Sequence, residues 1–257
     1  MKKQTRRQFV KHIGMLSAAG LATHPVLSHS FTEAVNRFPE KDSSGLTILF
    51  QGDSITDGNR TRHLDWNHVM GHGFAYLISS RLWCDYPEQE LMFYNRGVSG
   101  NTINDLNTRW QDDTIDLKPD IVNILIGVND ILAAIPQGNL PIEQMETDYR
   151  ALLTRTKNAL PDAKIVLCEP FILDVGHVTK QSDLWHNYTK QVQQLVKQLA
   201  NEFNAVHIAF QKHFDAACLR AKPDYWIWDG IHPMPAGHEL MARVWIEQMK
   251  PNLPFIK

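Results

Sequence analysis

A short apolar run near the middle of the chain does most to limit the possible folds. Residues 120–126, DIVNILI, are almost continuously apolar. A parallel strand covered on both faces has this pattern, because neither side of it meets water. Helices must then pack on both sides of the strand. The run therefore predicts a central strand of a parallel sheet within an α/β domain.

The segments around this run alternate between strand and helix patterns. Further strands are predicted at residues 46–51, 91–94, 164–168 and 205–208, and helices at residues 73–83, 102–110, 142–159, 182–203, 211–220 and 235–248. Such alternation builds βαβ units and one parallel sheet. Ligands of these folds bind beyond the carboxyl ends of the strands. Polar side chains that directly follow predicted strands are therefore the candidates for a functional site.

The N-terminus has the features of an export signal. Residues 5–11 (TRRQFVK) contain two adjacent arginines, and a short apolar stretch rich in small residues follows at 13–22. This stretch is too short to span a membrane, since a helix of that length covers only about 15 Å. The pattern resembles a bacterial twin-arginine signal, although a basic N-terminus without a targeting role is the alternative. We expect a signal at 1–30, a flexible lead-in at 31–44 and one domain at 45–257, in a periplasmic or secreted protein without a stable membrane anchor.

The charge balance argues against a nucleic-acid partner. The chain has 26 Lys and Arg against 28 Asp and Glu, and five of the basic residues but no acidic one fall within residues 1–30. Without that segment 21 basic and 28 acidic side chains remain, a net charge of −7 with neutral histidines. Nucleic-acid binding needs a concentrated basic face, which this composition does not favour. The oligomeric state is left open by the sequence.

Neither the cysteines nor the histidines predict a metal site or another cofactor. The three cysteines are far apart, odd in number and set among apolar residues, so we expect buried thiols without a disulfide framework: Cys84, Cys168 and Cys218. One local group of histidines lacks the spacing of a recognised ligand pattern, and a role at the rim of a site is the expectation for it: His63, His68 and His72.

Two motifs at opposite ends of the domain carry the groups of a serine hydrolase. GDSIT at residues 52–56 sets Ser54 just past the first predicted strand, and DGIHP at residues 229–233 sets Asp229 three positions before His232. A serine hydroxyl is a weak nucleophile until a base takes its proton, and a carboxylate orients that base and stabilises its charged form. The motifs therefore predict a triad of Ser54, His232 and Asp229, with activity rising through a group that titrates near or somewhat below neutrality.

Acyl transfer also needs donors for the oxyanion of the tetrahedral intermediate. Gly100 has no Cβ to block a close approach of its backbone N–H, Asn129 offers a side-chain amide, and Ser54 offers its own N–H. All three follow predicted strands. Their alternative roles are structural: a helix N-cap for Ser54, a tight turn for Gly100, and a cap or turn for Asn129. We expect Asp53 and Asp130 to be structural, and His238 to serve packing or the surface.

These blocks, taken in order, resemble those of the SGNH (GDSL) hydrolase superfamily. The resemblance spans residues 46–249 and implies Ser54 as nucleophile, His232 as base, Asp229 as its orienting acid, and Gly100 with Asn129 as oxyanion donors. It also implies a three-layer α/β/α sandwich with a flavodoxin-like five-stranded parallel sheet, and no metal. Further strings at residues 95–102, 109–113 and 118–120 are similar to a subgroup that includes acetylxylan esterases and related carbohydrate deacetylases.

The resemblance and the leader together suggest an exported esterase that removes short acyl groups, chiefly acetyl, from a small-molecule or oligosaccharide ester. Three tryptophans beside the catalytic blocks could stack on sugar rings or simply pack in the protein: Trp66, Trp226 and Trp228. A lysophospholipase or acyl-thioesterase of the same superfamily is the alternative. More remote are a metal-dependent phosphohydrolase, whose ligand spacing is missing, and a non-catalytic carbohydrate-binding protein. An α/β-hydrolase would need a G-x-S-x-G elbow, which the chain lacks.

Overall fold

The computed structural model describes residues 45–63 and 68–256. In this part of the chain five parallel strands form a sheet in the order β2-β1-β3-β4-β5. The strands are β1 (Thr47–Gly52), β2 (Met92–Asn95), β3 (Ile121–Leu125), β4 (Lys164–Cys168) and β5 (Val206–Ile208). The expected five-stranded parallel sheet is confirmed. The expected signal and lead-in, at residues 1–44, lie outside the described residues.

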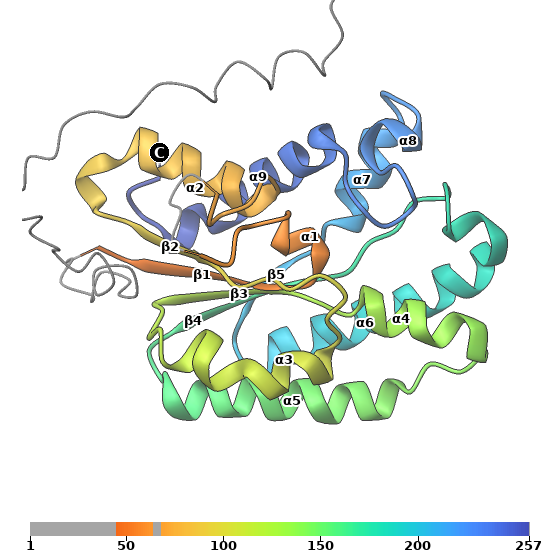
Figure 1. Cartoon of the computed structure of the whole chain (residues 1–257), viewed down its shortest axis with the longest axis horizontal. Helices are drawn as coiled ribbons and strands as arrows, with labels where there is room; N and C mark the ends of the chain where they lie inside the picture. The colour runs from red at the N-terminus through yellow and green to blue at the C-terminus, as the bar shows by residue number, and fades with distance from the viewer. Residues whose placement is uncertain (1–44, 64–67, 257) are drawn as a thin grey trace, which may run out of the picture. The chain divides into compact units, whose positions relative to one another are not determined.

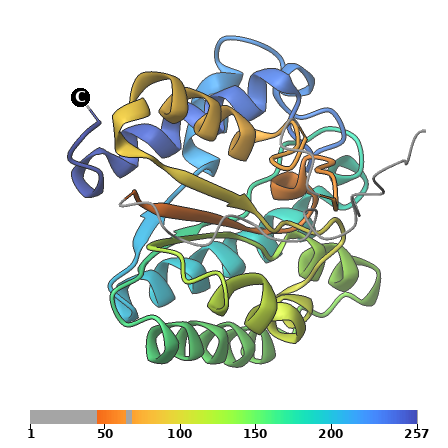
Figure 2. The same ribbon diagram turned by 60° about the vertical axis from the view of Figure 1, so that its left-hand side comes forward.

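Helices cover both faces of the sheet and complete the three-layer α/β/α fold (Figure 1). One layer contains α2 (Phe74–Asp85), α7 (Gln211–Cys218) and α9 (Pro235–Met249), and the other contains α3 (Ile103–Trp110), α5 (Ile142–Ala159) and α6 (Ser182–Glu202). Figure 2 shows the same two layers on either side of the strands. No helix among the described residues combines the length and the apolar character needed to cross a bilayer.

Short helices and turns complete the chain between these elements. The short α-helices are α1 (Ser54–Asp57), α4 (Val128–Ala134) and α8 (Pro223–Trp226). Single turns of 3-10 helix are η2 (Pro87–Gln89), η4 (Ile135–Gln137), η5 (Val178–Gln181) and η6 (Lys250–Asn252), and η3 (Gln111–Ile115) is a π-helical turn that continues α3. Two of the short helices, α1 and α4, directly follow strands, so they lie at the sheet edge where ligands of this fold bind.

The central strands are buried on both faces, as the apolar run at residues 120–126 predicted. Every residue of β1 and β3 is buried. On the side of α2 and α9, the ring of Phe50 contacts Phe74, Phe93 and Trp245 with centroid separations of 5.8, 6.5 and 5.7 Å. Aromatic contacts of this size supply much of the core energy of a domain. The sheet is therefore a rigid base for the loops at its carboxyl edge.

The cysteines are unpaired, but their burial differs from the expectation. Cys168 in β4 is fully buried, and its Sγ lies 3.2 Å from Oδ1 of Asn123. Cys218 is half-buried at the end of α7, and Cys84 is exposed near the end of α2. The prediction of three buried thiols therefore holds for Cys168, is met only in part by Cys218 and is wrong for Cys84. Its apolar sequence neighbours belong to the buried side of α2, whereas Cys84 itself lies on the side that faces solvent.

Candidate active site

The carboxyl end of β1 presents Ser54 as the first residue of α1. The side chain of Asp53, not that of Ser54, caps this helix: its Oδ1 accepts the N–H of Ile55 at 3.0 Å. Gly52 is required at the turn because a Cβ there would lie 2.3 Å from the carbonyl oxygen of Leu125. The cap frees the Ser54 hydroxyl from a role in the helix, so that it can make other contacts.

A chain of two hydrogen bonds connects Ser54, His232 and Asp229. Ser54 Oγ lies 2.8 Å from Nε2 of His232, and Nδ1 of the same ring lies 2.7 Å from Oδ2 of Asp229. Ser54 and His232 are 178 positions apart in the sequence. With the proton of the neutral ring on Nδ1, Nε2 is free to accept the Ser54 hydroxyl hydrogen. The structure thus brings together the three side chains that the two motifs contain.

The loop that carries Asp229 and His232 is fixed at both ends and in the middle. Ile227 and Pro233 pair in an antiparallel bridge, and the N–H of Met234 donates to the Trp226 carbonyl at 2.8 Å. The segment after β4 holds the loop from the other side, because the N–H of His177 donates to the Asp229 carbonyl at 2.8 Å. These backbone bonds explain how a loop can present an imidazole in one orientation.

The environment sets the charge states of Asp229 and His232. Burial acts to raise the pKa of Asp229, but the His232 ring and the N–H groups of His232 and Ile231 donate to its carboxylate and lower the pKa to about 2. The hydrogen bond from Asp229 raises the pKa of His232 above its usual value of 6.5, against the opposing effect of burial. Asp229 is therefore ionised at all ordinary pH values, and His232 gives up its proton at a higher pH than an isolated histidine.

Asp53 is a second carboxyl group, next to Ser54 in the sequence, and it is buried. Only 1% of its surface is exposed, and Oδ2 has no hydrogen-bond partner. Burial raises the pKa of Asp53 to about 7, although the N–H of Ile55 and the charge of His232 both act to lower it. The carboxyl group is therefore neutral in mildly acidic solution. Its contact with Ile55 agrees with the structural role expected from the sequence.

Gly100 and Asn129, two of the three expected oxyanion donors, lie on segments that are joined by a hydrogen bond. Gly100 is exposed with φ +84°, and a Cβ there would meet nothing within 4 Å. Asn129 lies in the first turn of α4, and its Nδ2 donates to the Asn101 carbonyl at 3.0 Å. A side-chain amide has two N–H hydrogens, so one of them remains available to a ligand. The carboxylate of Asp130 accepts the N–H of Ile103 at 3.3 Å and so joins α4 to the start of α3.

The tryptophans beside the catalytic blocks differ in exposure. Trp228 is 60% exposed, and its ring centroid is 6.4 Å from that of His232 with an angle of 26° between the planes. Trp226 is 8% exposed, so its ring offers no open face to a sugar. Trp66 lies outside the described residues. His238 is buried as a packing residue, and its Nδ1 accepts the N–H of Phe74 at 3.2 Å.

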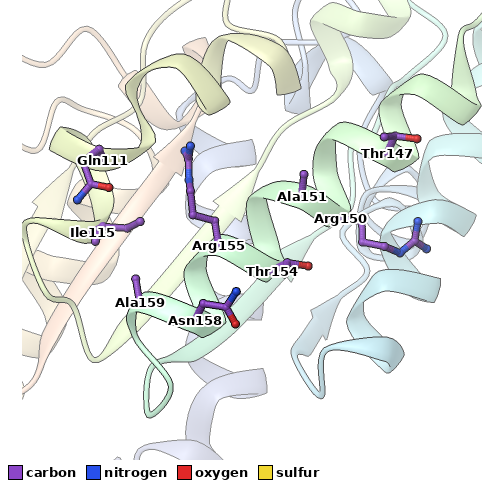
Figure 3. A pocket seen from close by; sticks show the side chains of 9 residues that line it. All are labelled: Gln111, Ile115, Thr147, Arg150, Ala151, Thr154, Arg155, Asn158 and Ala159. Carbon is purple, nitrogen blue, oxygen red and sulfur yellow. The ribbon is translucent and has the colours of Figure 1, made fainter.

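Two further features bear on function: the grouping of possible metal ligands, and a surface hollow. In the described ranges, no three His, Cys, Asp or Glu side chains are grouped so that they could hold a metal ion. The histidines of the local group are exposed: His63, His68 and His72. A hollow of about 780 Å³ lies between α5 and η3 (Figure 3). Its lining includes Arg150 and Arg155 but no residue of the triad.

Comparison with known proteins identifies the family of this chain. Residues 50–240 match the model of the GDSL-like lipase/acylhydrolase family. The chain belongs to that family. It is 32% identical over 216 residues to an acetylxylan esterase of Geobacillus stearothermophilus, and the match covers 81% of this chain and 96% of that enzyme. The chain is accordingly a carboxylic-ester hydrolase of the GDSL family.

Solved structures agree with this assignment. A crystal structure from Parabacteroides merdae, described as a GDSL-like lipase, shares 39% identity with a TM-score of 0.75, and covers 79% of this chain and 94% of that one. The Geobacillus acetylxylan esterase aligns with a TM-score of 0.71 at 32% identity, over 82% of this chain and 96% of that one. The family resemblance inferred from the sequence motifs is therefore confirmed, together with the fold.

Proposed function

We propose that the protein is a serine esterase that removes short acyl groups, chiefly acetyl, from carbohydrate through a covalent acyl-enzyme. The hydrogen-bonded chain from Ser54 through His232 to Asp229 carries this proposal. Among the solved structures of the Geobacillus acetylxylan esterase are catalytic mutants in which a serine, an aspartate or a histidine is replaced by alanine. In that enzyme the aspartate precedes the histidine by three positions, as Asp229 precedes His232.

In the proposed first half-reaction, Ser54 Oγ attacks the ester carbonyl carbon while Nε2 of His232 takes the hydroxyl proton. The carbonyl oxygen becomes an oxyanion that accepts hydrogen bonds from the N–H groups of Ser54 and Gly100 and from the side chain of Asn129. When the intermediate collapses, the C–O bond to the sugar breaks, and His232 returns the proton to the departing alkoxide. In the second half-reaction water attacks the acyl carbon while His232 takes a proton from it, and the bond from the acyl carbon to Ser54 Oγ then breaks as His232 returns the proton to Oγ and the acid is released.

A fluorophosphonate probe tests the nucleophile directly. We expect a covalent adduct on Ser54 in the folded protein, loss of labelling in Ser54→Ala, and a fall in kcat of several orders of magnitude in Ser54→Ala and His232→Ala. The double variant should be little worse than either single variant, because the two side chains act as a unit. An adduct on another residue, or unchanged ester hydrolysis by Ser54→Ala, would refute the assignment of the nucleophile.

Two observations favour acetyl esters of carbohydrate as substrates. The chain is 32% identical in sequence to an acetylxylan esterase, and the exposed ring of Trp228 lies beside His232. An exposed indole face beside the catalytic imidazole suits stacking on a sugar ring, with the ester directed toward Ser54. Acetate release from a panel of acetylated xylo-oligosaccharides, run beside an acyl-length series, tests this choice. A preference for chains of eight or more carbons over acetyl would instead favour a lysophospholipase or acyl-thioesterase of the same family.

Trp228→Ala separates sugar binding from chemistry. The substitution should raise KM for an acetylated oligosaccharide by about tenfold, since stacking on an aromatic face is worth about 1–2 kcal/mol. The same variant should leave KM for a small acetate ester without a sugar unchanged, because nothing in that substrate reaches the indole. Equal effects on both substrates would instead assign Trp228 to support of the His232 ring.

We further propose that residues 1–30 direct twin-arginine export to the periplasm or beyond, ahead of the lead-in at 31–44 and the hydrolase domain at 45–257. The adjacent arginines Arg6 and Arg7 and the short apolar stretch after them support this part of the proposal. Replacing both arginines with lysine in the full chain should keep the esterase inside the cytoplasm of a bacterial host. Export of that double variant at the normal level would refute the twin-arginine route.

A further inference from the structure

Arg109 in α3 connects segments that meet beside the candidate site. The guanidinium is largely buried, with 18% of the side chain exposed, and it donates to five acceptors in three segments of the chain. The distances are 2.9 Å to Gln51 Oε1, 3.3 Å to the Gly52 carbonyl, 2.8 Å to the Arg96 carbonyl, 2.7 Å to Asn101 Oδ1 and 2.9 Å to Asp113 Oδ2. In the sequence, Arg109 stands out only as part of a string that is similar to a subgroup of the family.

The first group of contacts holds the end of β1. Gln51 and Gly52 directly precede the turn that presents Ser54, and Arg109 binds both of them. The nitrogen of the Gln51 amide is also bonded, because Nε2 donates to the Thr114 hydroxyl at 2.8 Å. The position of the strand end, and hence of the Ser54 N–H, therefore depends in part on the guanidinium.

The second group of contacts holds the segment that carries Gly100. Arg109 binds the carbonyl of Arg96 before this glycine and the side chain of Asn101 directly after it. The main-chain carbonyl of Asn101 in turn accepts the side-chain amide of Asn129. One arginine is thus connected to the segments of all three expected oxyanion donors, and it touches none of the donors itself.

The chemistry of arginine suits this arrangement. Burial lowers the pKa of Arg109, and the hydrogen bond and charge of Asp113 act in the opposite direction, so the group keeps its charge at neutral pH. A guanidinium offers five N–H donors in a rigid planar fork. A lysine has one flexible ammonium and cannot reach carbonyls on separate segments in the same geometry. An Arg109→Lys variant would therefore keep the ion pair with Asp113 and lose most of the other contacts.

We propose that Arg109 is a positioning residue that fixes the three oxyanion-donor segments relative to one another, and so acts on the transition state through Asn101 and the end of β1. This inference rests on the proposed serine-esterase function. Donors that stabilise an oxyanion must be in place before the reaction, and a displacement of about 1 Å in an active site can lower the rate about 100-fold. Binding of the ester before the reaction depends less on the exact placement of these donors.

Steady-state kinetics of Arg109→Lys and Arg109→Ala test the proposal. We expect kcat to fall about 100-fold in Arg109→Lys, with KM within about threefold of the wild-type value. Inhibition by a boronic acid, which forms a tetrahedral adduct with an active-site serine, should weaken in parallel with kcat/KM. Arg155→Ala is the matched control, because exposed Arg155 also binds α3, at the Asn107 carbonyl, without touching the donor segments. Its kinetics should match those of the wild type.

A merely structural role predicts a different result. In that case the variants would lose folded protein, while the remaining folded fraction, counted by fluorophosphonate titration, would keep the wild-type kcat. Unchanged kcat per labelled serine in Arg109→Lys overturns the proposal. Should Arg109→Ala fail to fold, Asn101→Ala carries the test, because it removes the Oδ1 acceptor and leaves the main-chain carbonyl in place. This variant must also lose kcat at nearly constant KM.

A double-mutant cycle identifies the route of the effect. If Arg109 acts partly through Asn101, adding Arg109→Lys to Asn101→Ala should cost less than Arg109→Lys alone, and the remaining cost reflects its contacts with the end of β1. Full additivity of the two losses refutes that route. The outcome is also separate from the proposed function: loss of activity in Ser54→Ala with normal kcat in both Arg109 variants rejects this inference alone, whereas activity in Ser54→Ala rejects the serine mechanism itself.

Discussion

Replacing Asp53 with asparagine should make the protein more stable in neutral and alkaline solution relative to the wild type. The carboxyl group is 1% exposed, its Oδ2 has no partner, and burial raises its pKa to about 7. Asparagine keeps the Oδ1 atom that accepts the N–H of Ile55, and it has the shape of the neutral acid. Above pH 7 the wild type must bury a charge, whereas the variant carries none.

The magnitude follows from the shift of the pKa. In the unfolded chain Asp53 titrates near 3.8, and in the folded protein near 7. A raised pKa means that the folded state binds the proton more tightly, so this contribution to stability is complete below pH 3.8 and is lost as the pH rises through 7. The full difference is about 4 kcal/mol, and the part lost between pH 5 and pH 8 is about 2–3 kcal/mol.

Urea denaturation of wild type and Asp53→Asn from pH 5 to pH 8 measures this contribution. The difference in unfolding free energy between the two proteins reports Asp53 together with its coupling to His232, because the other titrating groups are common to both. It should shift by about 2–3 kcal/mol in favour of the variant as the pH rises. Glu202→Gln is the control, since Arg150 lowers the pKa of Glu202 below its ordinary value of 4.5 and its contribution changes in more acidic solution. A difference for Asp53→Asn that stays constant from pH 5 to pH 8 refutes a neutral buried Asp53.

The remaining predictions concern the orienting acid and two glycines. Asp229→Asn should lower kcat/KM by about 10³–10⁴-fold in ester hydrolysis, because the amide no longer fixes the imidazole tautomer. In the wild type, the stabilising effect of Asp229 should be lost as the pH falls from about 4 to 2. Acid unfolding followed by circular dichroism would show this loss. Gly52→Ala should yield little folded protein, because its Cβ would lie 2.3 Å from the Leu125 carbonyl oxygen. Gly100→Ala should fold with a loss of about 1–2 kcal/mol from its φ of +84°, since the methyl group meets no neighbour, and should lose kcat. Normal kcat in Gly100→Ala would contradict the assignment of its N–H as an oxyanion donor.

The regular elements of this fold were largely predictable from the pattern of apolar residues. The predicted helix at 142–159 and strand at 164–168 match α5 and β4 at both ends, because proline and charged residues separate long periodic segments there. The short helices α1 and α4 were not predicted. Four and seven residues are too few to show a helical period, and both helices depend on contacts at the sheet edge. These two helices carry Ser54 and Asn129.

Side-chain burial and long-range contacts were less predictable. Trp226 and Trp228 are two positions apart on either side of Ile227, which pairs with Pro233, yet one indole is buried and the other is exposed. Nothing in the local sequence indicates which of the two packs against the protein. The contacts of Arg109 were also predictable only in part. Its ion pair with Asp113 follows from an i,i+4 spacing on one helical face, but its contacts with Gln51, Arg96 and Asn101 depend on the tertiary fold.

The electrostatic coupling of Asp53 and His232 affects the pH dependence of the proposed catalysis. Each group affects the other: an ionised Asp53 raises the pKa of His232, and a charged His232 lowers the pKa of Asp53. As the pH rises, His232 must lose its proton to act as the proposed base, but ionisation of Asp53 over the same range favours keeping that proton. Two groups coupled in this way release their protons over a wider range than one group alone. The acid limb of kcat/KM should therefore be shallower than a single-proton titration in the wild type, and in Asp53→Asn it should be steeper and displaced to lower pH. A single-proton limb at the same position in both proteins would show that Asp53 stays neutral while His232 titrates.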